Sequence, residues 1–301
     1  MMLLRLQSVT SAIAQHLLRL QASLREQRGG NLLATGANTR AGKHQGEVFI
    51  VGAGPGDAEL LTRKAYRLLQ EADVVLFDWL VDESVLACIP RHVSKEFVGK
   101  RCGKHSVPQD QICSRLVRLA QEGKRVVRLK GGDPAVFART CEETQALEAA
   151  AIPFAIVPGI TAASGASAYT GIPLTDRRSA QALTMMTAQF QDPSKEADWG
   201  AIARQASHHT TVVYMGLKRL EQLSQRLLAH GISNDMPVAV IENACCRNQK
   251  VIIATVTDIV ERVDEADVQG PALVIIGKVV SARQHVNLSV LQEAQPVIAN
   301  G

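Results

Sequence analysis

Apolar and polar positions alternate along residues 46–280 in a pattern that predicts strands and helices in turn. The apolar run at 47–51 indicates a buried strand, and the segment at 63–72 has apolar residues at helical spacing after Thr62, a residue suited to cap a helix. Pro108 suits the first position of a helix over 108–122, which Gly123 ends. Further strands are expected at 74–77, 125–129, 154–157, 183–187, 211–214, 238–241, 251–256 and 273–276, and further helices at 141–151 and 217–230. This order predicts an α/β protein with largely parallel strands, at least in its first half.

The two ends of the chain and one internal run suggest the domain limits. Residues 1–45 carry an approximate helical stripe of leucines that ends at Gly29-Gly30, followed by a Gly/Asn/Thr/Ala-rich linker. A frayed helix, a partner-docking helix and a transit peptide all fit that extension. The small-residue run at 161–171, followed by Ile172-Pro-Leu-Thr175, is the expected crossing between two lobes. We therefore expect an extension at 1–45, α/β domains at 46–172 and 173–285, and a tail at 286–301.

A glycine-rich turn follows the first predicted strand, in the sequence Val51-Gly-Ala-Gly-Pro-Gly-Asp57. A dinucleotide fingerprint would need a third glycine where Asp57 stands. Pro55 also removes one backbone donor, and Asp78 after the next apolar run only imitates a ribose-binding acid. A turn short of donors and edged with carboxylate suits a neutral or cationic ligand better than a phosphate.

Composition excludes several classes of protein. The chain has 301 residues, 46% of them hydrophobic, yet no apolar stretch reaches the ~20 residues of a membrane span and nothing resembles a cleaved signal peptide. The six cysteines include no Cys-x-x-Cys pair, which indicates reduced thiols and a cytoplasmic location. His105 and the pair His208-His209 lack companions at metal-ligand spacing, so no metal is expected.

The net charge of +4 is unevenly distributed. Residues 1–45 hold six Lys/Arg against Glu26 alone, and residues 91–130 hold eleven Lys/Arg against three acids. A basic block of this kind can face a polyanionic ligand. Solvated faces of surface helices, with Arg115 and Arg118 among them, would explain about half of these charges equally well.

Several turns at strand ends form a more specific set. After the strand at 125–129 comes Lys130-Gly-Gly-Asp-Pro134, and after the strand at 154–157 comes Pro158-Gly-Ile-Thr-Ala-Ala163. Together with the turn at 51–57, Phe77-Asp-Trp-Leu-Val81, Val98-Gly-Lys-Arg101, Tyr214-Met-Gly216 and the segment at 270–277, these resemble the uroporphyrinogen-III C-methyltransferase family in order. The resemblance runs from about Gly46 to Val280.

The resemblance implies a two-domain tetrapyrrole methyltransferase fold with a ligand cleft between the domains, usually as a homodimer. It implies S-adenosylmethionine as methyl donor, uroporphyrinogen III as substrate and precorrin-2 as product, with no nucleic-acid or membrane partner. Implied catalytic residues are Asp78, Lys100, Arg139 and Glu142. Implied donor-binding residues are Pro55, Gly131, Gly132, Asp133, Val136, Thr161, Ala162, Met215, Ala244, Pro271 and Ala272.

These residue types suit that chemistry. Asp133 can pair with an ammonium group, and glycines allow close approach of the backbone. Arginine binds carboxylates through its planar fork, and methylation of a pyrrole carbon requires a base such as Asp78 to take a proton. The plainer interpretations are a turn cap for Asp78, a loop charge for Lys100, a local ion pair for Arg139 and Glu142, and core packing for Met215.

The chain departs from the family pattern at several positions, among them Trp79, Ala138, Thr140, Gln189 and Ala244. An alanine in place of glycine is tolerable where φ is negative and costly where φ is positive. These departures keep two alternatives open. One is a degenerate homologue that binds donor and serves as a scaffold or regulator, and the other is a sister methyltransferase acting on another corrin precursor.

Overall fold

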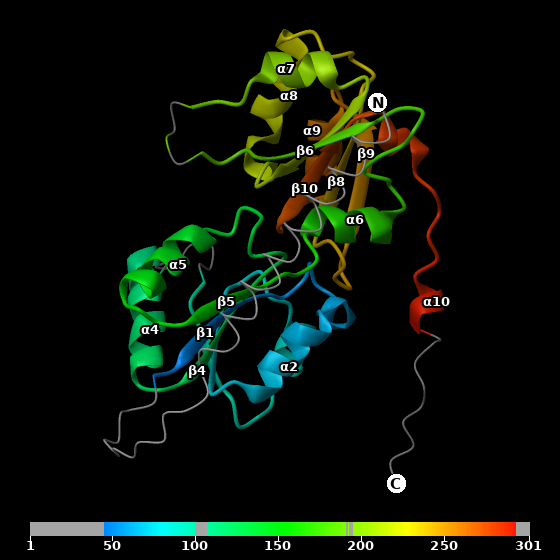
Figure 1. Cartoon of the computed structure of the whole chain (residues 1–301). Coiled ribbons are helices and arrows are strands. Elements are labelled where there is room, and N and C mark those ends of the chain that lie inside the picture. The colour runs from blue at the N-terminus through cyan, green and yellow to red at the C-terminus, as the bar shows by residue number, and fades with distance from the viewer. Residues whose placement is uncertain (1–44, 100–106, 191, 193–194, 293–301) are drawn as a thin grey trace, which may run out of the picture. The chain divides into compact units, whose positions relative to one another are not determined.

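A parallel sheet of five strands organises the first half of the described chain (Figure 1). The structure is a computed structural model that describes residues 45–99, 107–190, 192 and 195–292. The strand order is β3-β2-β4-β1-β5. The strands are β1 (Glu47–Gly52), β2 (Val74–Phe77), β3 (Ser94–Phe97), β4 (Arg125–Lys130) and β5 (Phe154–Val157).

Helices cover both faces of this sheet, which explains why β1 and β2 are apolar almost throughout, although β4 carries Arg125, Arg128 and Lys130. Val51 and Val127 face the core shared with α2 and α3, whereas Ile50 and Val126 face the core shared with α4 and α5. In Figure 1, α2 lies on one side of the strands and α4 and α5 on the other. The helices are η1 (Ala58–Leu60), α2 (Arg63–Glu71), α3 (Glu83–Ala87), α4 (Gln109–Gln121) and α5 (Thr140–Ala149).

The second half contains a mixed sheet of order β6-β7-β10-β8-β9. β6 and β7 run parallel, and the other neighbouring pairs run antiparallel. Successive apolar side chains along its strands point to opposite faces and pack into two cores. Val213 and Val240 face one core, and Val212 and Ile241 face the other. The strands are β6 (Ala182–Thr187), β7 (His209–Tyr214), β8 (Pro237–Glu242), β9 (Lys250–Thr255) and β10 (Ala272–Ile276).

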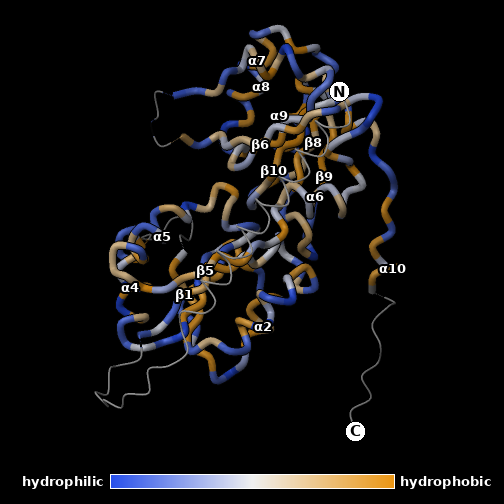
Figure 2. The backbone as a smooth tube through the Cα atoms, viewed as in Figure 1, coloured by the Kyte–Doolittle hydropathy of each residue, from blue (hydrophilic) through white to orange (hydrophobic). Residues whose placement is uncertain are grey.

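Two groups of helices cover the second sheet. α7, α8 and α9 pack on one face, and α6 packs on the other beside the short helix η3. Figure 2 shows the hydrophobic colour concentrated along the strands. The helices are α6 (Ala162–Thr170), α7 (Trp199–Gln205), η2 (Leu217–Arg219), α8 (Leu220–Ala229), α9 (Ile259–Glu265), η3 (Lys278–Ala282) and α10 (Ser289–Gln292).

The segment at 161–171, expected as a crossing, forms the helix α6. Ala163 and Ala166 are fully buried in the core of the second sheet. The small residues are needed because α6 lies very close to the first glycine-rich turn. A Cβ atom on Gly165 would sit 2.5 Å from Cγ of Pro55. The domain limits at 172 and 285 stay predictions, and residues 1–44 lie outside the described part of the chain.

The predicted strands and the long helices are confirmed within a few residues. The sequence pattern missed β3, whose residues Ser-Lys-Glu-Phe are mostly exposed at the edge of the sheet. It also missed the short helices α3, α7 and α9, which have five or seven residues each. Such elements show too few turns for an apolar period to stand out.

Candidate functional site

Three turns meet at the carboxyl ends of β1, β4 and β5. Gly54 and Gly132 exchange two backbone hydrogen bonds, of 3.1 and 2.7 Å between N and O. A Cβ atom on Gly159 would lie 2.3 Å from the carbonyl oxygen of Gly132, so no larger residue fits there. In open α/β sheets this edge is where ligands bind. The predicted residues Gly131, Gly132 and Asp133 therefore lie at a typical binding edge.

The carboxylate of Asp133 fixes two of these turns. Its Oδ1 accepts a hydrogen bond from the amide of Ala135 at 2.7 Å, and its Oδ2 accepts one from the amide of Gly159 at 2.9 Å. A carboxylate has about four acceptor positions, so capacity remains for a cationic partner. Gly132 has φ +70°, and a Cβ there would meet only the amide nitrogen of Ala162, at 3.9 Å. The surface above Gly132 is thus open to a ligand.

A second group of predicted residues gathers around Tyr214. The hydroxyls of Tyr214 and Thr161 lie 2.6 Å apart, and the amide of Ala163 donates to Tyr214 at 3.1 Å. The rings of Phe137 and Tyr214 have centroids 5.0 Å apart. Met215 follows with φ 56° and is 47% exposed, which argues against simple core packing. Tyr214 therefore brings together several of the predicted residues. Thr161 contacts it directly, and Ala162, Met215 and Val136 are neighbours in the chain of residues that do.

The loop after β8 carries the next predicted residue, Ala244. Ala244 is buried and does not have positive φ, although Asn243 and Cys245 on either side do, at 49° and 64°. An alanine is therefore accommodated there without backbone strain. The amide of Asn243 donates to the carbonyl of Pro271 at 2.9 Å, which places Pro271 and Ala272 beside this loop.

The same loop contacts the first glycine-rich turn. A Cβ on Gly56 would lie 2.5 Å from Sγ of Cys246, and one on Gly165 would lie 2.8 Å from Sγ of Cys245. Burial raises the pKa of Cys245 to about 12 and that of Cys246 to about 11, so both remain protonated thiols at neutral pH. The five cysteines in the described part of the chain are free.

Both carboxylate oxygens of Asp57 have partners within the fold, which the turn sequence did not predict. Its Oδ1 accepts from the amide of Glu59 at 2.8 Å, capping η1, and its Oδ2 accepts from the hydroxyl of Tyr169 at 2.6 Å. Both oxygens serve the fold. The lack of donors at Pro55 remains as the argument against a phosphate.

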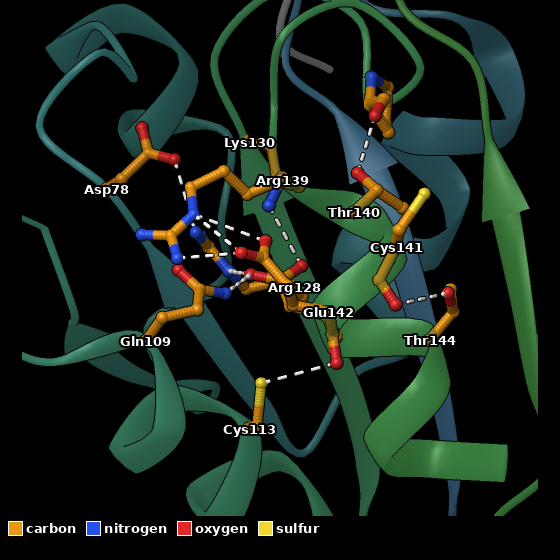
Figure 3. A network of polar contacts seen from close by, with 12 residues as sticks. Asp78, Gln109, Cys113, Arg128, Lys130, Arg139, Thr140, Cys141, Glu142 and Thr144 are labelled. Carbon is orange, nitrogen blue, oxygen red and sulfur yellow. Dashed lines mark hydrogen bonds and ion pairs between the residues drawn. The ribbon is translucent and has the colours of Figure 1, made fainter. Parts of the chain in front are cut away.

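Asp78 follows β2 and joins a network of buried charges (Figure 3). Its Oδ1 accepts from the amide of Leu80 at 3.2 Å, and its Oδ2 lies 3.4 Å from Nη2 of Arg128. The Arg128 side chain is 5% exposed, whereas that of Asp78 is 19% exposed. Asp78 is therefore both a turn cap, as the plainer interpretation has it, and the solvent-facing end of the network.

Glu143 stands at the centre of that network and is fully buried. Its carboxylate accepts from Nε of Arg128 at 3.1 Å, from Nζ of Lys130 at 2.8 Å and from Nε2 of Gln109 at 3.3 Å. Burial and the charge of Arg128 lower the pKa of Lys130, and Glu143 opposes that change. Removing one partner from such a cluster leaves an unpaired buried charge, which typically costs about 3–5 kcal/mol.

Arg128, Lys130 and Glu143 were not predicted from the sequence as neighbours of Asp78. One signal was present, because Arg128 and Lys130 stand two residues apart in an apolar strand and so share one face. Charges on a buried face need a partner. The sequence did not indicate that Glu143, fifteen residues after Arg128, is the acidic partner.

This network changes the interpretation of the basic block at 91–130. Of its eight basic residues in the described part, five form ion pairs with acids, namely Arg115, Lys124, Arg125, Arg128 and Lys130. Arg128 and Lys130 are buried and cannot reach a large ligand. Among the described residues of this block, Arg128 and Lys130 are therefore not available to a polyanionic ligand.

Arg139 and Glu142 form a local ion pair with Nη2 and Oε1 2.7 Å apart, and their side chains are 57% and 44% exposed. Both groups are open to solvent at the start of α5. Thr140, one of the departures, hydrogen-bonds through Oγ1 to the carbonyl of Pro134 and so closes the loop before α5. Trp79 is 49% exposed beside Asp78, and Gln189 is exposed after β6. Lys100 lies outside the described residues.

A cavity of about 420 Å³ lies next to this region. Phe137 from the first half lines it together with residues of β6 and α7, and Asp198 is the charged residue in its wall. Its lining is otherwise formed by Thr184, Met186, Thr187, Phe190, Ala197, Ala201, Ile202, Gln205 and Thr211. The wall of the cavity thus combines apolar side chains with three threonines, and β6 contributes no charged residue to it.

No helix among the described residues is long and apolar enough to cross a membrane. No group of three or more His, Cys, Asp or Glu side chains within 45–99, 107–190, 192 and 195–292 is arranged to hold a metal ion.

Comparison with solved structures gives a close match to the fold. Uroporphyrin-III C-methyl transferase from Thermus thermophilus, complexed with S-adenyl homocysteine, is 40% identical, with a TM-score of 0.67 over 79% of this chain and 100% of that one. The cobalt precorrin-4 methyltransferase CbiF is 27% identical, with a TM-score of 0.70 over 81% of this chain and 99% of that one.

Curated relatives agree with this match. Siroheme synthase from Acinetobacter baylyi is 50% identical over 240 residues, and that from Escherichia coli K12 is 48% identical over 244 residues. These matches cover 80% and 81% of this chain but 52% of each relative, so the chain spans about half the length of those proteins. The family described as Tetrapyrrole (Corrin/Porphyrin) Methylases matches residues 47–260, and the chain belongs to this family.

Proposed function

We propose that this chain is an S-adenosylmethionine-dependent methyltransferase that converts uroporphyrinogen III to precorrin-2, on the route to sirohaem or cobalamin. The observation that carries the proposal is the meeting of the turns after β1, β4 and β5 beside Asp78 and Tyr214, in a chain that matches the Thermus enzyme along that enzyme's whole length. The siroheme synthase relatives support the same reaction class.

The residues at this edge fit a sulfonium nucleoside. Open space above Gly132 accommodates a closely held group, and the remaining acceptor positions of Asp133 suit an ammonium. Pro55, Val136, Thr161, Ala162, Met215, Ala244, Pro271 and Ala272 would complete the binding surface. The bound donor would supply an electrophilic methyl group.

In the proposed reaction, the carbon–sulfur bond of the donor breaks as a bond to a pyrrole carbon forms, and S-adenosylhomocysteine leaves. Precorrin-2 carries two added methyl groups, so this step runs twice on each substrate molecule and consumes two donor molecules. The methylated ring then carries a positive charge and loses a proton, which the carboxylate of Asp78 accepts. Lys100 is proposed as the proton donor. Arg139, exposed at the start of α5, would bind substrate carboxylates in exchange for Glu142. Aligning donor and acceptor supplies most of the remaining acceleration.

The test combines donor binding with product formation. Titration calorimetry with S-adenosylmethionine should give a saturable binding isotherm, and anaerobic incubation with uroporphyrinogen III should give the precorrin-2 chromophore. Asp78→Asn should lower turnover by about 100-fold or more, the usual contribution of a general base, with donor affinity unchanged. Donor binding without any methylated tetrapyrrole would favour the scaffold alternative. Methylation of only another corrin precursor would favour the sister enzyme.

We also infer a homodimer in the cytoplasm. The dimer rests on the family resemblance, and the location on that resemblance and on the cysteine pattern. Light scattering should give about twice the chain mass of 32.5 kDa. A mass of one chain at micromolar concentration would overturn the dimer.

A further inference from the structure

We propose that Arg128 is a positioning residue that holds the carboxylate of Asp78 in the orientation in which it accepts a proton. The inference rests on the proposed function and adds a residue to it. Arg128 lies on β4, at the position paired with Leu76 of β2, two residues before Asp78. Its guanidinium can therefore reach past the end of β2 to the loop that carries Asp78.

Each guanidinium nitrogen of Arg128 has a different acceptor. Nε donates to Glu143 at 3.1 Å, Nη1 donates to the carbonyl of Leu129 at 2.9 Å, and Nη2 points at Asp78 at 3.4 Å. Because the group is planar, two of these bonds determine where the third donor points. The position of the Asp78 carboxylate is thus set from inside the protein (Figure 3).

Glu143 makes this arrangement rigid. It is fully buried and also accepts from Lys130 and Gln109, so its carboxylate is fixed from β4 and from α4. The cluster contains two basic and two acidic side chains, Arg128 and Lys130 against Glu143 and Asp78. Only Asp78 among these four reaches solvent to an appreciable extent, with 19% of its side chain exposed. The buried side chains of Arg128, Lys130 and Glu143 fix the position of the Asp78 carboxylate, which is the group that can contact a substrate.

A lysine at position 128 keeps the buried positive charge but lacks the fork, so it can pair with Glu143 or Asp78 but does not orient both. Arg128→Lys should lower kcat by about tenfold or more and leave KM for S-adenosylmethionine within about twofold, because the donor-binding turns keep their own hydrogen bonds. Arg125→Lys is the matched control. It makes the same substitution three residues earlier on β4, where Arg125 pairs with Glu47 and Glu71, and should leave kcat unchanged.

A double-mutant cycle with Asp78→Asn separates positioning from a general structural defect. If Arg128 acts through Asp78, Arg128→Lys should lower kcat by less than about twofold in the Asp78→Asn background. An equal loss in both backgrounds, or no loss in either, would overturn the proposal.

Crystal structures of Arg128→Lys and Arg125→Lys provide a test that does not depend on activity. The Asp78 carboxylate should leave its present orientation in the first variant and keep it in the second. An unmoved Asp78 in Arg128→Lys overturns the positioning role even if the enzyme is active. An inactive wild-type protein would instead refute the proposed function, and the crystal comparison would still decide what orients Asp78.

Discussion

Arg139 shows how a single residue can hold a conformation that its own contacts do not explain. It stands at φ 55° and ψ 29° just before α5, where a non-glycine residue is strained by about 1 kcal/mol or more. Its ion pair with Glu142 is exposed, and such pairs contribute only about 0.2–1 kcal/mol. We infer that the side chain is retained there for its role toward the substrate.

Arg139→Gly should therefore change the free energy of unfolding by less than about 1 kcal/mol, because relief of strain offsets the greater freedom of glycine in the unfolded chain. The same variant should lose at least about tenfold in kcat/KM for uroporphyrinogen III, since a charged contact is removed. Urea denaturation and steady-state kinetics measure the two effects. Arg262→Gly, in the equally exposed pair with Glu265 on α9, should instead lose about 1 kcal/mol of stability and no activity. Full activity in Arg139→Gly would contradict this view.

At the same scale, the sequence could identify residue types but not their partners. The sequence indicated that alanine at position 244 is tolerable only if its φ angle is not positive. The structure meets this condition, because the positive φ angles fall on the neighbours Asn243 and Cys245. The sequence placed Asp78 in the site from its motif. It did not find Glu143, because the cluster around it depends on how α5 packs against β4.

Two helix ends allow the role of glycine to be separated into conformation and space. Gly171 ends α6 at φ +72°, and Gly231 follows α8 at φ +83°. A Cβ on Gly171 would lie 2.0 Å from the carbonyl oxygen of Gln284, whereas one on Gly231 would meet nothing within 4 Å. The conformational cost of alanine is thus shared, and the steric cost belongs to Gly171 alone.

Gly231→Ala should lower the free energy of unfolding by about 1 kcal/mol, the cost of a left-handed alanine. Gly171→Ala should cost at least about 2 kcal/mol more, because backbone must move to admit the methyl group. Equilibrium unfolding in urea of both variants measures the difference directly. Equal losses would mean that the segment at 284 yields freely and that α6 is not held by it.

Elements were predicted well wherever their pattern was long. The strands β1, β2, β4 and β5 of the first sheet and the helices α2, α4 and α8 were recognised because apolar residues repeat over several turns or fill a buried strand. The helix α6 was taken for a crossing, because a run of Ala, Ser and Gly has no apolar period. Its burial in the core of the second sheet depends on close contacts that small residues permit.

On the scale of the whole molecule, a few contacts join α6 and the loop after β8 to the first glycine-rich turn. Tyr169 donates to Asp57 across 112 positions in sequence, and Cys246 lies against Gly56. Contacts so distant in the chain leave no local pattern, which is why the partners of Asp57 were not predicted from the turn sequence. They also surround the proposed donor site, so its shape depends on both halves of the fold.

The bond between Tyr169 and Asp57 gives the molecule a stability term that depends on pH. Burial raises the pKa of Tyr169 above its ordinary value of 10.0, and the hydrogen bond to Asp57 raises it further. Because the neutral hydroxyl is favoured in the folded state, this stabilisation is fully present below about pH 10 and is lost as pH rises through the folded pKa.

Tyr169→Phe should lower the free energy of unfolding by about 1.5 kcal/mol, a typical contribution for a hydrogen bond to a charged group. The difference from wild type should be constant between about pH 7 and 9 and shrink above about pH 10. Raised thiol pKa values at Cys245 and Cys246 affect both proteins alike and cancel in the difference. Tyr66→Phe, at a ring that is 50% exposed on α2, should show no such difference, and a gap that widens above pH 10 would refute the assignment.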